Sequence, residues 1–212
     1  MKRRLFLAFS LLMALAGCQT AYYATMEKFG YEKRDLLKRA VEAARGEQKE
    51  AQVEFKDALT RLKALYSFQG GDLEKKYNQL KSDFDSCETQ AKDVKKRIND
   101  MDEVAKDLFA EWEKEIGQIS NASMASNSRT KLSETRSRYQ QLAATLQQSE
   151  ASMDPILRSF KDHVLYLKHN LNAAAIGSLK GEATNIQNDI ERLILQMNGS
   201  IAEADAFIKT LN

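Results

Sequence analysis

The most regular pattern in the chain runs from Asp72 to Gly117, where apolar residues recur at alternating steps of four and three. A straight α-helix has about 3.6 residues per turn, so a repeat of 3.5 makes the apolar seam wind around a partner as a left-handed supercoil. The repeat extends over about six heptads, more than the three or four that suffice to predict a coiled coil. The positions between, Asp83 among them, are almost all charged or polar, and we expect them on solvated faces. The seam consists of Leu73, Tyr77, Leu80, Phe84, Cys87, Ala91, Val94, Ile98, Met101, Ala105, Leu108 and Trp112.

An earlier amphipathic stretch predicts a helix over 25–68, with a wider apolar stripe than that of the second helix. Gln69-Gly70-Gly71 interrupts the pattern, and Asp72 is a suitable N-cap for the helix that follows. So short a connection indicates that the two helices fold back on each other as an antiparallel hairpin. The stripe consists of Phe29, Leu37, Ala40, Ala44, Ala51, Phe55, Ala58, Leu62 and Leu65, flanked by Leu36, Val41, Leu59 and Tyr66.

Residues 118–128 are rich in Ser, Asn and Ala, and we expect them to form a mobile loop. A third apolar pattern over 129–176 carries through Asp154-Pro155 without a change of phase, which favours one long kinked helix over two independent ones. Gly177-Ser178 offers a stop and a restart before a last pattern over 179–211. This shorter helix either joins the bundle as a fourth member or extends the third helix.

These patterns together predict an all-α fold. Residues 25–212 are expected to form a long antiparallel coiled-coil bundle of three long helices and a shorter C-terminal helix. The composition agrees, because proline occurs once and glycine nine times in 212 residues. The formal net charge is +2, and the charges are evenly mixed, which argues against a general nucleic-acid binder.

The N-terminus has the order of a secretory signal. Lys2-Arg3-Arg4 precedes a short apolar run over 5–14, and Leu15-Ala16-Gly17-Cys18 follows. This last segment resembles the lipobox of bacterial lipoproteins. The resemblance implies removal of a signal peptide over 1–17 and acylation of Cys18, including a palmitate-type chain, with 18–24 as anchor and short linker. Several acyl chains on one residue are enough for stable membrane anchoring.

Two features next to this anchor bear on where the protein sits. By resemblance to lipoprotein sorting, Gln19 implies the outer membrane, facing the periplasm. Tyr22 and Tyr23 fit two environments equally, the lipid headgroup level and the start of the bundle core.

Residues able to carry chemistry are few. Cys87 lies on the apolar seam, and the simpler interpretation is that its side chain is a small buried apolar group. His163 and His169 lack the Glu-x-x-His spacing of di-iron bundles; we expect His163 beside the core and His169 on a solvated face. We therefore expect no enzyme activity, no cofactor and no metal.

Three residues near the predicted loop are candidate contacts for a partner or ligand: Trp112, Ile119 and Met124. Trp112 is most simply the plug of the bundle end, with its indole N–H bonded to a polar group, although tryptophan is also common at binding hot spots. The regular seam of the second helix can pair within the chain or with another copy, and the short connection at 69–71 favours pairing within the chain.

The lipobox, the near-continuous helix, the Gly-Gly hairpin and the Ser/Asn loop together resemble a family of uncharacterised bacterial lipoproteins with a domain of unknown function. The resemblance implies secretion and a helical coiled-coil fold, and it implies no activity. The sequence leads to the hypothesis of a non-catalytic envelope rod that binds or spaces a protein partner. The alternative is a protein that recognises lipid or cell-wall glycan through the bundle end and residues 117–128.

Overall fold

The structure, a computed structural model, describes residues 2–67, 72–170 and 172–211, with side chains described from Lys33 onward except at positions 173 and 183. Every regular element in this part of the chain is a helix, as the apolar periodicity predicted. The helices are α1 (Lys2–Tyr66), α2 (Leu73–Ile116), α3 (Ala122–Ala151), α4 (Met153–His169), α5 (Ala173–Lys180) and α6 (Ala183–Thr210).

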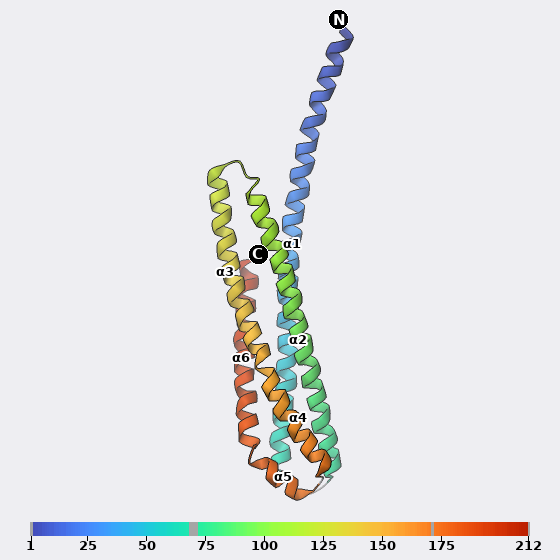
Figure 1. Ribbon diagram of the computed structural model, residues 1–212, viewed down its shortest axis with the longest axis vertical. Coiled ribbons are helices and arrows are strands. Elements are labelled where there is room, and N and C mark those ends of the chain that lie inside the picture. Colours follow the sequence, from blue (N-terminus) through green and yellow to red (C-terminus); the bar gives the residue numbers. More distant parts are fainter. Residues whose placement is uncertain (1, 68–71, 171, 212) are drawn as a thin grey trace.

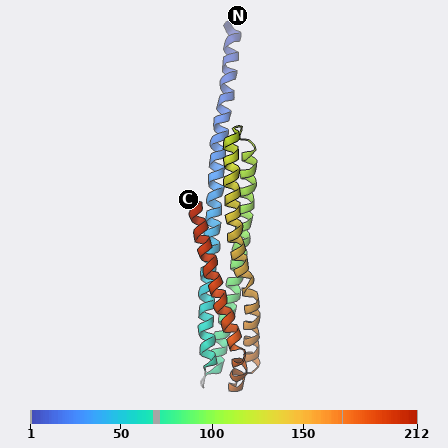
Figure 2. The same ribbon diagram turned by 90° about the vertical axis from the view of Figure 1, so that its left-hand side faces the viewer.

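The helices form an antiparallel bundle with four corners (Figure 1). α1 packs against α2 and α6, while the α3–α4 pair packs against the same two helices from the opposite corner. Neighbouring corners run in opposite directions, and α1 and α3 lie on a diagonal without direct contact between their backbones (Figures 1 and 2). The predicted antiparallel hairpin of the first two long helices is confirmed, and α6 is the fourth member of the bundle instead of an extension of the third helix.

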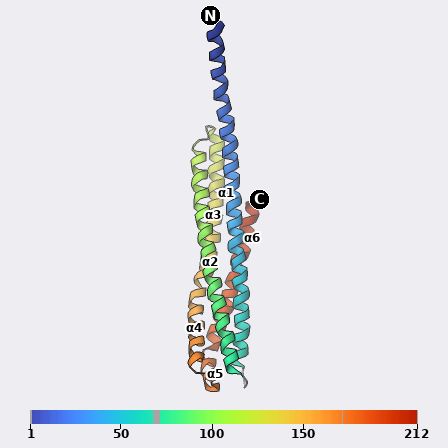
Figure 3. The ribbon, with the colours of Figure 1, turned by 90° about the vertical axis from the view of Figure 1, so that its right-hand side faces the viewer.

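The fourth corner is filled over only part of the bundle length, because α6 ends at Thr210. Near that end, the rings of Phe207 and Tyr139 are 6.0 Å apart. Beyond this level the bundle consists of α1, α2 and α3 (Figure 3). α1 continues past the bundle at the same end, which is the end that carries the α2–α3 connection (Figures 1 and 3).

The core follows the predicted seams. Nine of the twelve seam residues of α2 are buried, and Leu73, Tyr77 and Trp112 at its two ends are half-buried. On α1 the predicted residues from Leu36 to Tyr66 are buried or half-buried, except for Leu36 itself, which is 48% exposed. The predicted stripe residue Phe29 lies outside the described side chains. Heptad spacing thus places the core correctly along both helices.

The predicted termini of α2 are confirmed. The Asp72 carboxylate accepts a hydrogen bond of 2.9 Å from the backbone N–H of Lys75, which satisfies one of the donors left free at a helix start. At the other end Gly117 is the C-cap.

The predicted loop over 118–128 is wrong for most of its length, because α3 already begins at Ala122. The side chain of Asn121 accepts a hydrogen bond of 3.0 Å from the backbone N–H of Met124 and caps the helix. Asparagine and serine are as typical of helix starts as of loops, so composition alone could not separate the two.

The third long helix is interrupted once near the Asp154-Pro155 step. Ser152, between α3 and α4, keeps a right-handed helical conformation, and the two helices continue in nearly the same direction (Figure 1). The prediction of one long kinked rod therefore describes this corner of the bundle. The rod ends at His169, earlier than the predicted end at residue 176.

The predicted break at Gly177-Ser178 is wrong, since both residues lie inside α5. The chain instead turns before this point, where Asn172 caps α5 by accepting a hydrogen bond of 3.0 Å from the backbone N–H of Ala175. A second turn precedes α6 at Ala183. A side-chain cap therefore decides the boundary here, where a glycine was expected to decide it.

Candidate functional site

Trp112 of α2 contacts both α1 and α3 at the end of the bundle that carries the α2–α3 connection. It is half-buried and packs against the core. Its indole Nε1–H donates a hydrogen bond of 3.0 Å to the Ser128 hydroxyl of α3, and the Arg34 guanidinium of α1 lies 5.5 Å from the ring centroid. A cation at this distance over an indole face is attracted by the ring quadrupole. The arrangement matches the predicted plug of the bundle end.

A small pocket of about 80 Å³ lies next to this plug. Lys33 and Glu111 form an ion pair of 2.8 Å beside it, and burial followed by the charge of Glu111 raises the pKa of Glu115. Ligand sites for drug-sized molecules generally measure about 300–1,000 Å³, so this pocket is too small to enclose such a ligand. Its lining consists of Arg34, Leu108, Glu111, Trp112 and Glu115.

The other two predicted contact residues differ in exposure. Ile119, in the α2–α3 connection, is half-buried and packs against the core. Met124, on the first turn of α3, is 62% exposed. Only Met124 of the three presents a free apolar side chain to the surroundings, whereas Trp112 and Ile119 belong to the edge of the core.

The predicted lipidation site, Cys18, lies outside the residues whose side chains are described, as do Tyr22 and Tyr23. Their roles remain predictions. A search of the described residues for a helix both long and apolar enough to cross a membrane finds none.

Cys87 and His163 are both held inside the bundle. Cys87 is fully buried, and burial, with a smaller effect of Glu54, raises the pKa of its thiol to about 12, which disfavours the reactive thiolate. His163 is also buried, its Nδ1 lies 2.7 Å from the Tyr66 hydroxyl oxygen, and burial lowers its pKa. His169 is exposed, as predicted. Within the described part of the chain, no three His, Cys, Asp or Glu residues lie close enough to hold a metal ion.

Asp83 was expected on a solvated face, and this prediction is wrong. Asp83 is only 7% exposed, and Arg61 of α1 donates a hydrogen bond of 2.7 Å to one of its carboxylate oxygens. Burial raises the pKa of Asp83, while the Arg61 charge opposes this shift. The pairing joins two helices through residues far apart in sequence, so the pattern along α2 alone could not reveal it.

Several polar side chains are buried within the core. Gln48 of α1 is fully buried, and its side-chain N–H donates a hydrogen bond of 3.0 Å to the Ser200 hydroxyl of α6. Ser149 of α3 is also fully buried, and its hydroxyl has no partner among the described residues; the same holds for the Gln48 side-chain oxygen. Gln48 and Ser149 fall in line with the apolar residues of their helices, and the sequence gives no sign of the hydrogen bond between Gln48 and Ser200.

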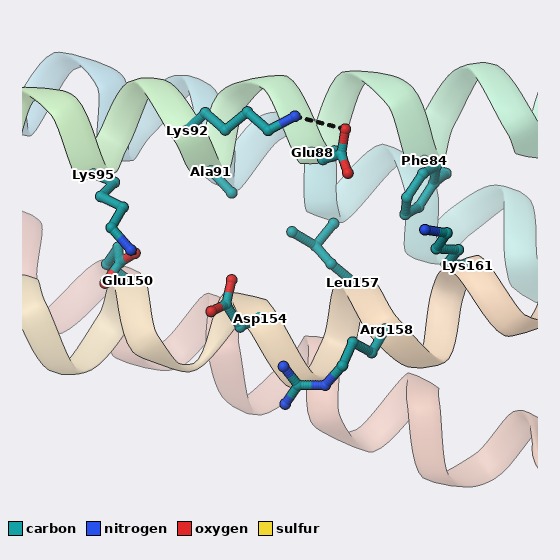
Figure 4. A pocket seen from close by; sticks show the side chains of 10 residues that line it. All are labelled: Phe84, Glu88, Ala91, Lys92, Lys95, Glu150, Asp154, Leu157, Arg158 and Lys161. Carbon is teal, nitrogen blue, oxygen red and sulfur yellow. Dashed lines mark hydrogen bonds and ion pairs between the residues drawn. The ribbon is translucent and has the colours of Figure 1, made fainter.

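A groove of about 340 Å³ lies between α2 and the α3–α4 rod (Figure 4). Its floor is apolar, with Phe84 and Ala91 from α2 and Leu157 from α4. Lys92 pairs with Glu88 at 2.8 Å along α2 (Figure 4), and Lys95 pairs with Glu150 across the groove at 3.6 Å. The remaining lining residues are Asp154, Arg158 and Lys161.

Comparison with known proteins gives one family. A family profile described as "Protein of unknown function (DUF2959)" matches residues 22–211. No curated protein and no solved structure matches the chain.

Proposed function

Because the chain belongs to the family described as "Protein of unknown function (DUF2959)", we propose a function from its own residues: a lipid-anchored rod of the bacterial cell envelope that binds or spaces a protein partner without catalysing a reaction. The observation that carries this proposal is the placement of the lipobox, Leu15 to Cys18, in the same helix that becomes a corner of the bundle. An anchor at Cys18 would thereby be coupled to the whole rod.

An anchor at Cys18 would give the rod one orientation relative to the membrane. α1 enters the bundle beside Trp112, where Lys33 pairs with Glu111. At 1.5 Å per residue, helix from Cys18 to Lys33 would measure about 22 Å, and from Lys33 to Tyr66 about a further 50 Å. With Cys18 anchored, the end with the α2–α3 connection would face the membrane, and the end with α5 would lie about 70 Å from the anchor.

The interior supports a binding or spacing role more than a catalytic one. The core is filled by apolar side chains, and Cys87 and His163 are both inside it. Two grooves, of about 340 and 330 Å³, are open to the surroundings and lie between helix surfaces. A rod of this kind presents long side faces to a partner and holds them at a fixed height.

The anchor is tested by replacing Cys18 with alanine. We expect the wild-type protein to fractionate with the outer membrane and to yield an acylated N-terminal peptide by mass spectrometry. The Cys18→Ala variant should lack the acyl groups and leave the outer membrane fraction. Cys87→Ala is the matched control, since this buried thiol should not affect fractionation. An unmodified wild-type Cys18 would refute the proposal.

A second candidate function is recognition of lipid or cell-wall glycan by the membrane-facing end. It is favoured by Met124, which is 62% exposed at that end. We expect Met124→Asp to weaken binding to vesicles or to isolated cell-wall glycan if this function holds. Leu195→Asp is the control, because Leu195 is 70% exposed on α6. Equal binding by both variants and the wild type would rule out Met124 as a contact.

A further inference from the structure

We propose that the outer face of the α1–α6 pair is a dimerisation surface, on which a second copy of this chain docks with its rod parallel to the first. This face carries the most exposed large apolar side chain described on each helix. Val53 of α1 is 56% exposed, and Leu195 of α6 is 70% exposed. The dimer goes beyond the proposed function, and its parallel orientation rests on that function, because two copies anchored at Cys18 in one membrane would point the same way.

Val53 and Leu195 lie at the same height on the outside of the bundle. α1 and α6 are antiparallel neighbours (Figures 1 and 2). The side chain of Gln52 donates hydrogen bonds of 3.3 Å to the Ile194 carbonyl and 2.8 Å to the Asn198 side-chain oxygen. Each exposed apolar residue therefore directly follows a residue of this bridge between the helices. A two-fold axis parallel to the rods would place Val53 of each copy against Leu195 of the other.

Two glycines inside helices lie on the same face. Gly199 follows Leu195 by one turn, and Gly46 precedes Val53 by two turns. Glycine in a helix interior costs about 1 kcal/mol relative to alanine. A Cβ added at either position would meet nothing within 4 Å, so no contact among the described residues requires these glycines. They allow the backbone of a second copy to approach closely, and the exposed Ala202, three residues after Gly199, continues the strip.

The charges around the two apolar side chains do not oppose the approach of a second copy. The exposed charged residues within one turn of Val53 are two acidic and two basic, and those within one turn of Leu195 are one of each sign. Neither group has a net charge, so identical faces do not repel each other. The six residues are Lys49, Glu50, Lys56, Asp57, Glu191 and Arg192.

Four of these charges are complementary between two copies. Lys56 and Asp57 follow the exposed apolar residue of α1 by one turn, and Glu191 and Arg192 precede that of α6 by one turn, so all four lie at one height. Their contacts within the chain place Lys56 and Glu191 toward the α1–α6 junction, and Asp57 and Arg192 away from it. With α1 of one copy over α6 of the other, Lys56 would face Glu191 and Asp57 would face Arg192.

The size of the face suits a dimer. α6 has 28 residues, and at 1.5 Å per residue it is about 42 Å long. Two helices side by side, each about 10 Å wide, make the face about 20 Å across. The footprint of about 800 Å² per copy equals what each partner buries in a typical specific complex. An apolar centre with a charged rim is also the usual anatomy of an interface. Anchoring in one membrane would raise the effective concentration of the two copies further.

The test uses the full chain in its own membranes, with Cys87 replaced by alanine and Cys18 kept. One copy carries Val53→Cys, and a second copy with a different tag carries Leu195→Cys. We expect a short bismaleimide to join them into a dimer that contains both tags. The matched control pairs Val53→Cys with Leu165→Cys, because Leu165 is 43% exposed on α4, which has no backbone contact with α1. Copies without introduced cysteines show any contribution of Cys18.

A charge placed in the strip then tests the contact itself. Ala202 is exposed in the single chain, so the carboxylate of Ala202→Glu is solvated there and loses water only in the dimer. We expect this substitution to lower the yield of the Val53–Leu195 crosslink at least about tenfold. Ala144→Glu is the matched control, since Ala144 is exposed on α3. Thermal unfolding followed by circular dichroism checks that both variants remain folded.

Several outcomes would overturn the inference. A crosslink yield unchanged by Ala202→Glu would do so, as would a product that joins one tagged copy to a different protein. Stronger crosslinking between two Val53→Cys copies than between Val53→Cys and Leu195→Cys would indicate antiparallel rods. Anchored protein without the crosslink would reject the dimer and leave the anchored rod intact, whereas a crosslinked dimer outside the membrane fraction would reject the anchored rod and keep the dimer.

Discussion

Replacing Gln48 with leucine is expected to stabilise the protein, although it removes a hydrogen bond between two helices. Gln48 is fully buried, and its side-chain N–H donates to the Ser200 hydroxyl at 3.0 Å. Ser200 also donates its own hydroxyl hydrogen to the Met197 carbonyl at 3.0 Å, so it keeps one bond in the variant. The Gln48 side-chain oxygen has no partner among the described residues.

The balance of these terms gives the sign of the change. Loss of the hydrogen bond costs about 1 kcal/mol, whereas a buried acceptor without a partner costs about 1–3 kcal/mol in the wild type. Leucine removes that penalty and places an apolar side chain among apolar neighbours. We expect the free energy of unfolding to rise by about 1–3 kcal/mol, with a rise in Tm of about 2–4 °C per kcal/mol for a chain of this size.

The measurement is urea unfolding of the wild type and the Gln48→Leu variant, followed by circular dichroism. Gln140→Leu on the exposed face of α3 is the matched control and should change the free energy of unfolding by less than about 0.5 kcal/mol. Gln48→Ala should destabilise the protein, because it leaves a cavity.

A loss of more than about 1 kcal/mol in Gln48→Leu would refute the reasoning, because it would show that the Gln48 oxygen is satisfied in solution. Ser149→Ala would then test whether Ser149 is the partner. Its hydroxyl is equally buried and without a partner among the described residues. Non-additivity above about 0.5 kcal/mol between the two substitutions would indicate a direct or water-mediated bond between them.

Three further predictions concern buried residues of α2 and α4. Phe160→Ala removes a fully buried ring whose centroid lies 5.8 Å from that of Phe84. In urea titration it should lower the free energy of unfolding by about 3–5 kcal/mol. A loss below about 1 kcal/mol would contradict the observed packing. The lowered pKa of His163 means that the unfolded chain takes up protons more readily below about 6.5, so wild-type Tm should fall as the pH drops through this value toward the lower folded pKa. His163→Asn, which keeps an acceptor for the Tyr66 hydroxyl but does not titrate, should weaken this pH dependence; an unchanged slope would assign it to other groups. The Cys87 thiol should react with a thiol reagent only after denaturation, and rapid reaction of the folded protein would show that the seam opens.

The sequence predicted those features of the fold that depend on neighbouring residues of one helix. The strict heptad repeat placed Cys87 and Trp112 correctly, because burial on a seam follows from periodicity. It also placed His163 beside the core. Boundaries were less certain, because Asn121 and Asn172 are equally typical of loops and of helix caps. Only the backbone geometry shows which role each residue takes.

Features that join two helices could not be predicted in the same way. The burial of Asp83 depends on Arg61, and the α2–α4 groove depends on which charged faces meet after folding. A charged residue between seam positions looks the same in sequence whether it faces the surroundings or a neighbouring helix. The three predicted contact residues at the bundle end also differ in a way that depends on folding. Trp112 and Ile119 pack against the core, whereas Met124 is exposed.

The continuity of α1 also determines how the bundle would carry mechanical load. A pull applied at an N-terminal anchor, and resisted by a partner bound along the bundle, would act along the helix axes. It would slide α1 lengthwise past α2 and α6, so that the contacts along their shared length resist at the same time. Peeling two helices apart from their connecting turn would instead break contacts one after another, at a much lower force. Anchored in this way, the bundle would act as a stiff tether between the membrane and whatever it holds.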